Sequence, residues 1–279
     1  MDYTCSLPSE SYIFAEAQLN ETQSTRETSL GELSTWISEN PELNVERDAV
    51  HLLYFLRGAK FNVDKAKDKI KRYYRMRAER SEWFTNRNPF HPELDELLKI
   101  GVCFPLRERD EHNRLVVVIR TGAHNPRKHT QNNVFKVCKM LIDLAIRADE
   151  SISIFGVSAV LDMTGVTLGH ALQLKPTLIK RTVACWETYP CRARRLEFVN
   201  APAHVNVVLN IFRSFMSAKL KERVFVTKGL PKNNENLPAN LGGHGPSYQE
   251  LAVYWRKTAQ ESAEWFAQNE QYKMTLAAP

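Results

Sequence analysis

Hydrophobic residues recur every three or four positions between residues 31 and 76. This is the spacing of one helix face, and it is interrupted at Pro41 and after Gly58, which predicts three consecutive helices. Asn62 precedes the third helix and can cap it, because its side-chain oxygen accepts a hydrogen bond from a free backbone N–H. The pattern therefore predicts a small helical domain over residues 31–92.

Residues 1–30 carry no sustained hydrophobic period, and we expect them to form a mobile arm. The stretch is also acidic and polar, whereas a signal peptide joins a basic stretch to an apolar one, so export is not expected. The longest uninterrupted apolar run, Leu115–Ile119, is far shorter than the roughly 20 residues that cross a bilayer. These features predict a soluble protein of the cytoplasm.

Beyond Phe90 the helical period gives way to alternating strand and helix signals. Apolar runs that are typical of strands lie at 114–120, 154–162, 196–200 and 224–227. Helical stripes separate these runs, and such alternation implies crossover helices and an at least partly parallel sheet. We therefore expect an α/β domain over residues 93–246, followed by a C-terminal helix and tail over 247–279.

Composition and charge narrow the function classes. The 279 residues are 43% hydrophobic and 25% charged, as in ordinary globular proteins. The formal charge of +6 favours attraction to nucleic acid or to anionic lipid without choosing between them. The five cysteines are odd in number and include no CxxC pair, which argues against a disulfide framework or a zinc site. No metal and no cofactor are expected.

Catalytic motifs are absent from the sequence, since it contains no phosphate loop, no GxGxxG, no HExxH and no GxSxG. Asp162, at the end of an expected strand, is the best single catalytic candidate, but capping of the following turn is the preferred interpretation. His170 is better explained as a hydrogen-bonded histidine than as a base or ligand. Cys185 and Cys191 have no histidine nearby in sequence, so apolar packing is preferred to nucleophilic chemistry.

The segment 204–223, HVNVVLNIFRSFMSAKLKER, predicts a helix that is apolar on more than one side. Periodicity alone leaves two alternatives equally open, a fully buried core helix and a helix that contacts a membrane. Lys219 and Arg223 are four residues apart at its C-terminal end, which predicts a shared helix face. Arg192, Arg194 and Arg195 form a cluster just before the preceding strand. A broad apolar helix beside a basic cluster favours membrane contact.

Several blocks of the sequence occur in a recognisable order. Phe55-Leu56-Arg57 and KFNVDKAKDKIKRYY come first, and VLDMTG at 160–165, YPCRARRLEFVNAP at 189–202 and LPANLGG at 237–243 follow. The first two resemble the helical N-terminal module of the CRAL-TRIO family, and the other three resemble its lipid-binding domain. The order and spacing of these blocks match the family over about Gly31 to Leu251. The likeness is greatest to the branch that contains the α-tocopherol transfer protein and the retinaldehyde-binding protein. The resemblance implies an α/β domain with a mixed, largely parallel sheet and a mobile gate helix.

The resemblance also implies a non-enzymatic carrier that holds one hydrophobic molecule, such as a tocopherol-like, retinoid-like or other terpenoid lipid, in an apolar cavity. Pocket positions fall on Phe135, Cys138, Ile142, Val157, Leu161, Cys185, Cys191 and Leu196. Gate positions lie within Asn200 to about Ser217, on Val205, Val208, Leu209, Phe212, Phe215 and Met216. A phosphoinositide-binding cleft falls on Arg192, Arg194, Lys219 and Arg223. Asn240 and Leu241 replace an acidic and an aromatic family residue, so tocopherol itself is not inferred as the ligand.

The resulting hypothesis is a monomeric carrier that transfers its ligand at phosphoinositide-containing membranes through transient contact. One rival is a lipid-responsive signalling or scaffold module with a pocket filled by side chains. A second is an enzyme that acts on a lipophilic substrate through Asp162 or His170. Nucleic-acid binding is disfavoured, because the basic residues are not interleaved with aromatic residues in a recognisable motif.

Overall fold

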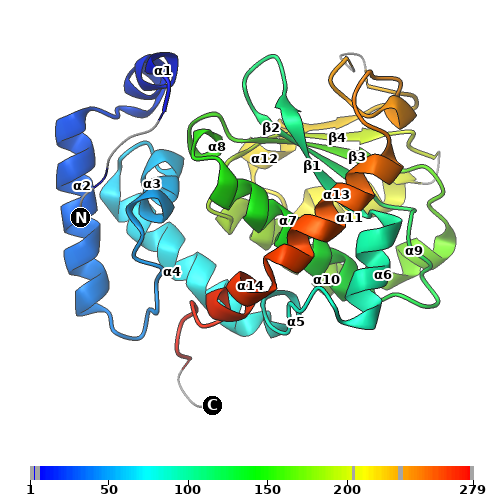
Figure 1. The fold of residues 1–279 in the computed structure, drawn as a ribbon, viewed down its shortest axis with the longest axis horizontal. Helices are drawn as coiled ribbons and strands as arrows, with labels where there is room; N and C mark the ends of the chain where they lie inside the picture. Colours follow the sequence, from blue (N-terminus) through cyan, green and yellow to red (C-terminus); the bar gives the residue numbers. More distant parts are fainter. Residues whose placement is uncertain (1–2, 4–6, 203–204, 232–234, 277–279) are drawn as a thin grey trace.

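The structure, a computed structural model, describes residues 3, 7–202, 205–231 and 235–276 and has a helical N-terminal part beside an α/β domain (Figure 1). The N-terminal helices are α1 Ser9–Leu19, α2 Gln23–Glu39, α3 Ala49–Gly58, α4 Val63–Glu79, α5 Ser81–Phe84 and α6 Pro92–Ile100. Asn62 caps α4 as predicted, since its side chain accepts a hydrogen bond of 2.9 Å from the backbone N–H of Lys65. The predicted α/β class with a helical N-terminal part is confirmed.

Residues 1–30, for which the sequence predicts a mobile arm, contain regular structure in the described part of this stretch. Helix α1 lies within it, and α2 begins at Gln23 rather than near Gly31. Ala15 and Leu19 pack against Ile154 of the α/β domain. The helices are weakly amphipathic, so the hydrophobic pattern of this stretch did not reveal them.

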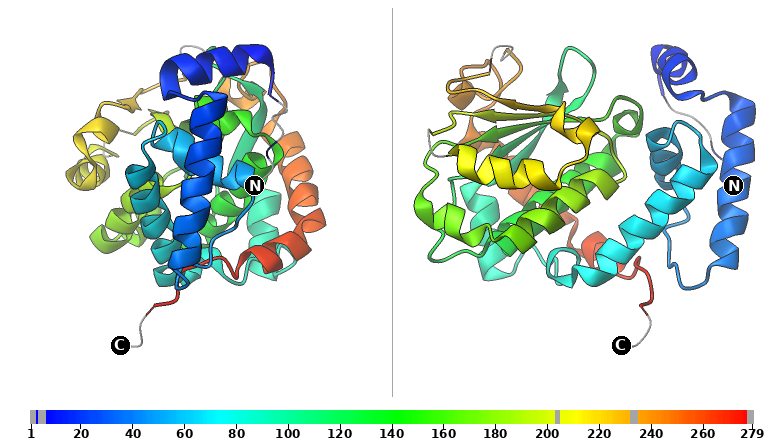
Figure 2. Two further views of the ribbon diagram at one scale, coloured as in Figure 1. Left: turned by 90° about the vertical axis from the view of Figure 1, so that its left-hand side faces the viewer. Right: turned by 180° about the vertical axis from the view of Figure 1, so that it is seen from behind.

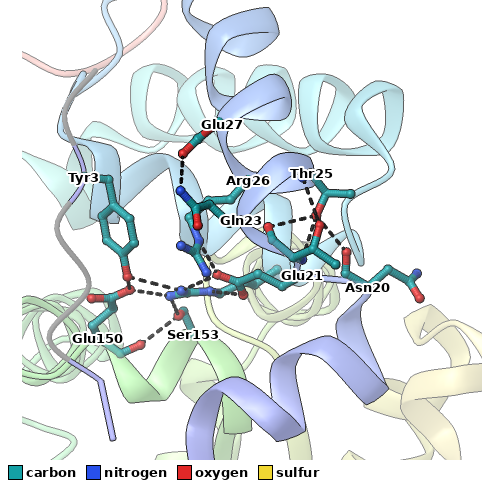
Figure 3. A network of polar contacts seen from close by, with 11 residues as sticks. Tyr3, Asn20, Glu21, Gln23, Thr25, Arg26, Glu27, Glu150 and Ser153 are labelled. Atoms are coloured by element: carbon teal, nitrogen blue, oxygen red, sulfur yellow. Dashed lines mark hydrogen bonds and ion pairs between the residues drawn. The ribbon is translucent and has the colours of Figure 1, made fainter. Parts of the chain in front are cut away.

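A polar network joins this N-terminal segment to the rest of the protein (Figure 3). Glu21, between α1 and α2, is buried and pairs with Arg26 at 2.9 Å and with Arg57 of α3 at 2.7 Å. Arg57 also contacts Glu150 at 2.6 Å and Ser153 at 2.8 Å, so it reaches the α/β domain. Residues far apart in sequence are therefore held by one buried guanidinium.

In the described residues the sheet has five strands in the order β1-β2-β3-β4-β5. They are β1 Cys103–Arg109, β2 Leu115–Arg120, β3 Val157–Asp162, β4 Ala193–Val199 and β5 Val224–Val226. β1 and β2 are antiparallel, and every other neighbouring pair is parallel. The sheet is therefore mixed and largely parallel.

The helices of the α/β domain connect its strands or follow the last strand, and they pack around the sheet (Figure 1). They are α7 Gln131–Ala148, α8 Ser151–Phe155, α9 Leu168–Gln173, α10 Pro176–Thr188, α11 Val205–Phe215, α12 Ala218–Lys221, the 3-10 turn η1 Ala239–Leu241, α13 Tyr248–Glu261 and α14 Ala263–Asn269. α13 docks on α6, α7 and β1, and its Trp255 donates a 2.8 Å hydrogen bond from Nε1 to the carbonyl of Pro105. Within the described residues, no helix is long and apolar enough to cross a membrane.

Two segments differ from the sequence-based expectation. The run 154–162 is not all strand, because residues up to Phe155 end α8, and Gly156 separates that helix from β3. The long helix expected from residue 204 is divided into α11 and α12 at Met216–Ser217. Ser217 caps α12 by accepting a hydrogen bond from Leu220 N at 3.3 Å. Residues 203–204 of the expected gate segment lie outside the described residues.

Candidate functional site

An apolar cavity lies between one face of the sheet and helices α7, α9, α10 and α11. Alternate strand residues form its floor, because side chains two positions apart point to the same face of a sheet. These floor residues are Val117 and Ile119 of β2, Val157, Ala159 and Leu161 of β3, and Leu196 and Phe198 of β4. About 200 Å³ of the cavity is open to the centres of water-sized molecules.

The eight pocket positions implied by the family resemblance all line this one cavity. α7 supplies Phe135, Cys138 and Ile142, and the sheet supplies Val157, Leu161 and Leu196. Cys185 of α10 and Cys191, which precedes β4, complete the set. Their contact with a ligand stays a prediction, but the fold brings them around a single space.

Helix α11 lies next to α10 (Figure 2, right). Its inner residues line one side of the cavity. Four of the six predicted gate residues line the cavity: Val205, Val208, Leu209 and Phe212. Phe212 stacks on Trp186 of α10, with ring centroids 5.6 Å apart and planes 13° from parallel. The inner face of α11 is therefore held by apolar and aromatic contacts rather than by ion pairs.

The other two predicted gate residues do not line the cavity. Met216 is buried in the apolar cluster beneath the helix, and Phe215 is 37% exposed. Val207, on the outer side of α11, is 68% exposed. α11 thus has apolar residues on both its inner and outer sides, which a helix of an ordinary soluble core does not need.

The four predicted phosphoinositide-binding residues form one basic cluster at the start of β4 and the end of α12. Arg192 donates to the carbonyl oxygen of Ile154, and Arg223 donates to that of Ala193. Arg194 donates from Nε to the carbonyl of Phe155 at 3.3 Å. Arg223 follows α12 in a turn instead of sharing a helix face with Lys219, because the helix ends at Lys221.

Gly156 lets the backbone pass close to this cluster. Its φ of +89° is rarely adopted by other residues, and an added Cβ would lie 2.6 Å from the carbonyl oxygen of Arg192. Only glycine at position 156 therefore allows the backbone of Arg192 to lie this close to the start of β3.

Lys69 of α4 adds a basic group that the sequence analysis missed. Its Nζ lies 3.2 Å from the position of a Cβ added at Gly58, and that Cβ would lie 3.7 Å from the carbonyl oxygen of Pro190. Lys69 is therefore near the segment that leads into β4 and carries Arg192, whose charge affects its pKa. Lys60, in the turn before α4, also contributes positive charge at Lys219. No sequence pattern links these lysines to the α/β domain, because α4 meets α10 only in the folded chain.

The electrostatics of the cluster are those of cations without counterions. Burial and then neighbouring positive charges lower the pKa of Arg192, Arg194 and Lys219. Burial lowers the pKa of Lys69 to about 8, and the positive charge of Arg192 acts in the same direction. Within the described part of the chain, none of these four groups forms a salt bridge with a carboxylate. Such an arrangement stabilises a bound anion.

The two catalytic candidates, Asp162 and His170, form hydrogen bonds that hold neighbouring segments of the chain together. Asp162 accepts hydrogen bonds from Thr164 N at 3.0 Å, from Asn200 Nδ2 at 3.0 Å and from Tyr248 OH at 3.0 Å, so it closes a turn and anchors two further segments. His170 donates from Nε2 to the carbonyl oxygen of His124 at 2.9 Å, and its Nδ1 accepts from the backbone N–H of Thr167 at 3.1 Å. Among the described residues, no cluster of His, Cys, Asp and Glu could hold a metal ion.

Burial disfavours the thiolate form of two cavity cysteines, Cys185 and Cys191. Burial raises the pKa of Cys185 and raises that of Cys191 to about 12. Because the thiolate is the reactive form, a raised pKa disfavours nucleophilic chemistry at both.

Comparison with known proteins gives matches over most of the chain. A family model described as the CRAL/TRIO domain matches residues 99–243, and one described as a Pinta-like UBA domain matches residues 22–94. Clavesin-2 of Homo sapiens is 23% identical over 246 residues, which cover 84% of this chain and 74% of clavesin-2. The alpha-tocopherol transfer protein-like protein of Mus musculus is 26% identical over 242 residues, which cover 86% of this chain and 70% of the relative.

A solved structure shares the fold. The crystal structure of Sfh5 matches with a TM-score of 0.51 at 13% sequence identity, and the match covers 85% of this chain and 98% of Sfh5. The CRAL/TRIO model itself covers more than half of the 279 residues. Together with the mixed sheet and its cavity, these matches establish that the chain belongs to the CRAL/TRIO family.

Proposed function

We propose that this protein is a non-enzymatic carrier that binds one hydrophobic molecule in the cavity and exchanges it with phosphoinositide-containing membranes. The observation that carries the proposal is the apolar cavity beneath α11, with a basic cluster at the adjoining end of the sheet. Membership of a family whose relatives include a transfer protein-like protein supports it.

Burial energetics explain why a membrane is needed for release. A lipid that buries roughly 400 Å² of apolar surface gains on the order of 10 kcal/mol at about 25 cal/mol per Å². Four basic side chains near an anionic leaflet contribute about 1 kcal/mol each, so docking alone cannot expel the ligand. The bilayer must take the place of the cavity as apolar surroundings.

The mechanism that we infer has two steps. Arg192, Arg194, Lys219 and Arg223, together with Lys69, first bind the phosphates of a lipid head group and dock the protein. Helix α11, whose outer Val207 already faces outward, then moves into the lipid and opens the cavity. The break at Met216–Ser217 supplies a flexible end for this motion, because no helical hydrogen-bond ladder continues through it into α12.

A vesicle experiment tests the docking step. Arg192→Ala/Arg194→Ala protein should lose cosedimentation with phosphatidylcholine vesicles that contain phosphatidylinositol bisphosphate, and should lose ligand transfer to them. Arg195→Ala is the matched control, because Arg195 is in the same strand but pairs with Glu197 at 2.9 Å and lies over the Phe225 ring. Unchanged transfer by the double variant would refute the mechanism.

Native mass spectrometry tests the carrier role itself. Protein purified from its own cells should carry one lipophilic molecule, recovered chemically unchanged after extraction. Conversion of that molecule on incubation would favour the enzyme alternative. The signalling-module alternative predicts a pocket that is filled by side chains, whereas the cavity of this structure has free space.

A further inference from the structure

A lysine side chain faces the largely apolar cavity. Lys139 of α7 is only 7% exposed, yet it lines the cavity between the predicted pocket positions Phe135 and Ile142. Its Nζ lies 4.3 Å from the centroid of the Trp83 ring and 5.4 Å from that of Phe135. The side chain is thus buried with its charged end among aromatic groups and cavity space.

Lys139 has no anionic partner in the part of the chain that the structure describes. The carboxylate at the favourable helical spacing of four residues is Asp143, but Arg87 occupies it at 3.0 Å and the Tyr189 hydroxyl donates to its other oxygen. Lys136, one turn away, instead donates to the carbonyl of Thr85 at 2.8 Å. Lys139 alone of these two lysines is left without an oxygen acceptor.

Its other neighbours do not replace an anion. Aromatic faces attract a cation but accept few of the three N–H donors of an ammonium. Lys139 also lies near the Cys185 thiol, whose pKa is raised by burial and lowered in part by this ammonium. A neutral thiol is a weak acceptor, so the buried charge keeps unused capacity to bind an oxygen anion.

We propose that Lys139 binds the carboxylate of the ligand, and that the preferred ligand is therefore a long hydrophobic molecule ending in a carboxylic acid. This inference rests on the proposed function, because it assumes that a lipid occupies the cavity. The apolar floor and α11 would hold the hydrocarbon part, while the ammonium would form a charge-assisted hydrogen bond to the acid.

Two probes that differ only in their head group test the proposal. Oleate and oleyl alcohol share one hydrocarbon chain, and their affinities for the delipidated protein can be measured by calorimetry. Wild-type protein should bind oleate at least about tenfold more tightly, since the ammonium pairs with a charged carboxylate in oleate but only with a neutral hydroxyl in the alcohol. Lys139→Met should abolish this preference and keep oleyl alcohol binding.

Lys180→Met is the matched control, because it makes the same chemical change on an exposed position of α10 outside the cavity. This variant should retain the wild-type preference. Equal wild-type affinity for the two probes, or an unchanged preference in Lys139→Met, would overturn the head-group assignment alone. Binding of neither probe to the wild-type protein would overturn the apolar carrier proposal as well.

A measurement on the wild-type protein avoids dependence on variant folding. The carboxyl carbon of bound [1-¹³C]oleate can be followed by NMR as the pH falls. Beside an ammonium the carboxyl should still be ionised at about pH 5, whereas burial without a cation raises a carboxyl pKa. Protonation of the bound acid above about pH 6 would contradict the proposal.

Discussion

Arg57 and Glu21 form a buried two-point ion pair, in which Arg57 Nε lies 2.7 Å from Glu21 Oε2 and Arg57 Nη2 lies 2.7 Å from Glu21 Oε1. Arg57 also holds Glu150, at the start of α8, at 2.6 Å. One guanidinium therefore connects the α1–α2 junction, α3 and the α/β domain. This arrangement fixes residues that the sequence pattern suggested were a mobile arm.

Removing the Glu21 charge should destabilise the protein. Loss of one partner from a buried ion pair costs about 3 kcal/mol, because the remaining charge stays buried. Glu21→Gln should therefore lower the free energy of unfolding measured by urea titration. Glu27→Gln, in exposed α2 surface, is the control and should change little. Equal stability of the two variants would show that the ion pair does not hold the N-terminal helices.

The same pair predicts a pH dependence. Burial alone would raise the pKa of Glu21, but the hydrogen bonds and charges of Arg57 and Arg26 outweigh it and hold the pKa below its usual value. A carboxylate with a lowered pKa stabilises the fold above its unfolded-state pKa of about 4.3, and this stability is lost as the pH falls further. Wild-type protein should thus lose more stability than Glu21→Gln on acidification below that pH.

The outer side of α11 provides a test of membrane contact. Val207 is 68% exposed, so Val207→Asp should leave the melting temperature nearly unchanged while weakening transfer to vesicles. A carboxylate at this position would have to enter the lipid and would be repelled by an anionic surface. Val253→Asp is the matched control, because Val253 is 61% exposed on α13, away from α11. Equal transfer by both variants would argue that α11 does not enter the membrane.

The sequence allowed prediction of those features that depend on local pattern. The apolar runs located β2 and β4, and Asn62 located the start of α4. Family-like blocks also indicated eight residues that the fold places around one cavity. These features depend on neighbouring residues or on matched motifs, so one amino-acid sequence was sufficient to predict them.

Features that depend on tertiary packing were missed. β1 is an edge strand that contains Pro105, which masks a strand pattern. α1 is stabilised by Ala15 and Leu19 against a distant domain, and Lys69 joins the basic cluster only through the packing of α4. In the sequence, Lys139 occupies a polar position of an amphipathic helix, and nothing in that pattern indicates that its side chain faces the cavity.

The buried thiols give a prediction that separates the carrier from a thiol enzyme. Burial raises the pKa of Cys191 to about 12, and it also raises that of Cys185. In a Cys5→Ser background, both should resist alkylation by iodoacetamide at pH 7.5 until the protein is unfolded. Intact and peptide mass spectrometry would measure this. Alkylation of either residue in the folded protein at the rate of a free thiol would restore nucleophilic chemistry as a possibility.

The last prediction concerns the pH dependence of membrane docking. Lys69 must be protonated to bind a phosphate, and burial together with the charge of Arg192 lowers its pKa to about 8. Docking should therefore be full below that pH and weaken as the pH rises through it. At pH 9 about one tenth of the lysines stay protonated, so the affinity for vesicles containing phosphatidylinositol bisphosphate can fall by up to about tenfold.

Lys69→Arg provides the comparison, because a guanidinium keeps its charge at this pH. Its cosedimentation with the same vesicles should vary less between pH 7 and pH 9 than that of the wild-type protein. Vesicles of phosphatidylcholine alone give the background at each pH. If the two proteins lose binding in parallel, Lys69 does not contact the head group, and the anion site is confined to the arginines of β4 and the residues around α12.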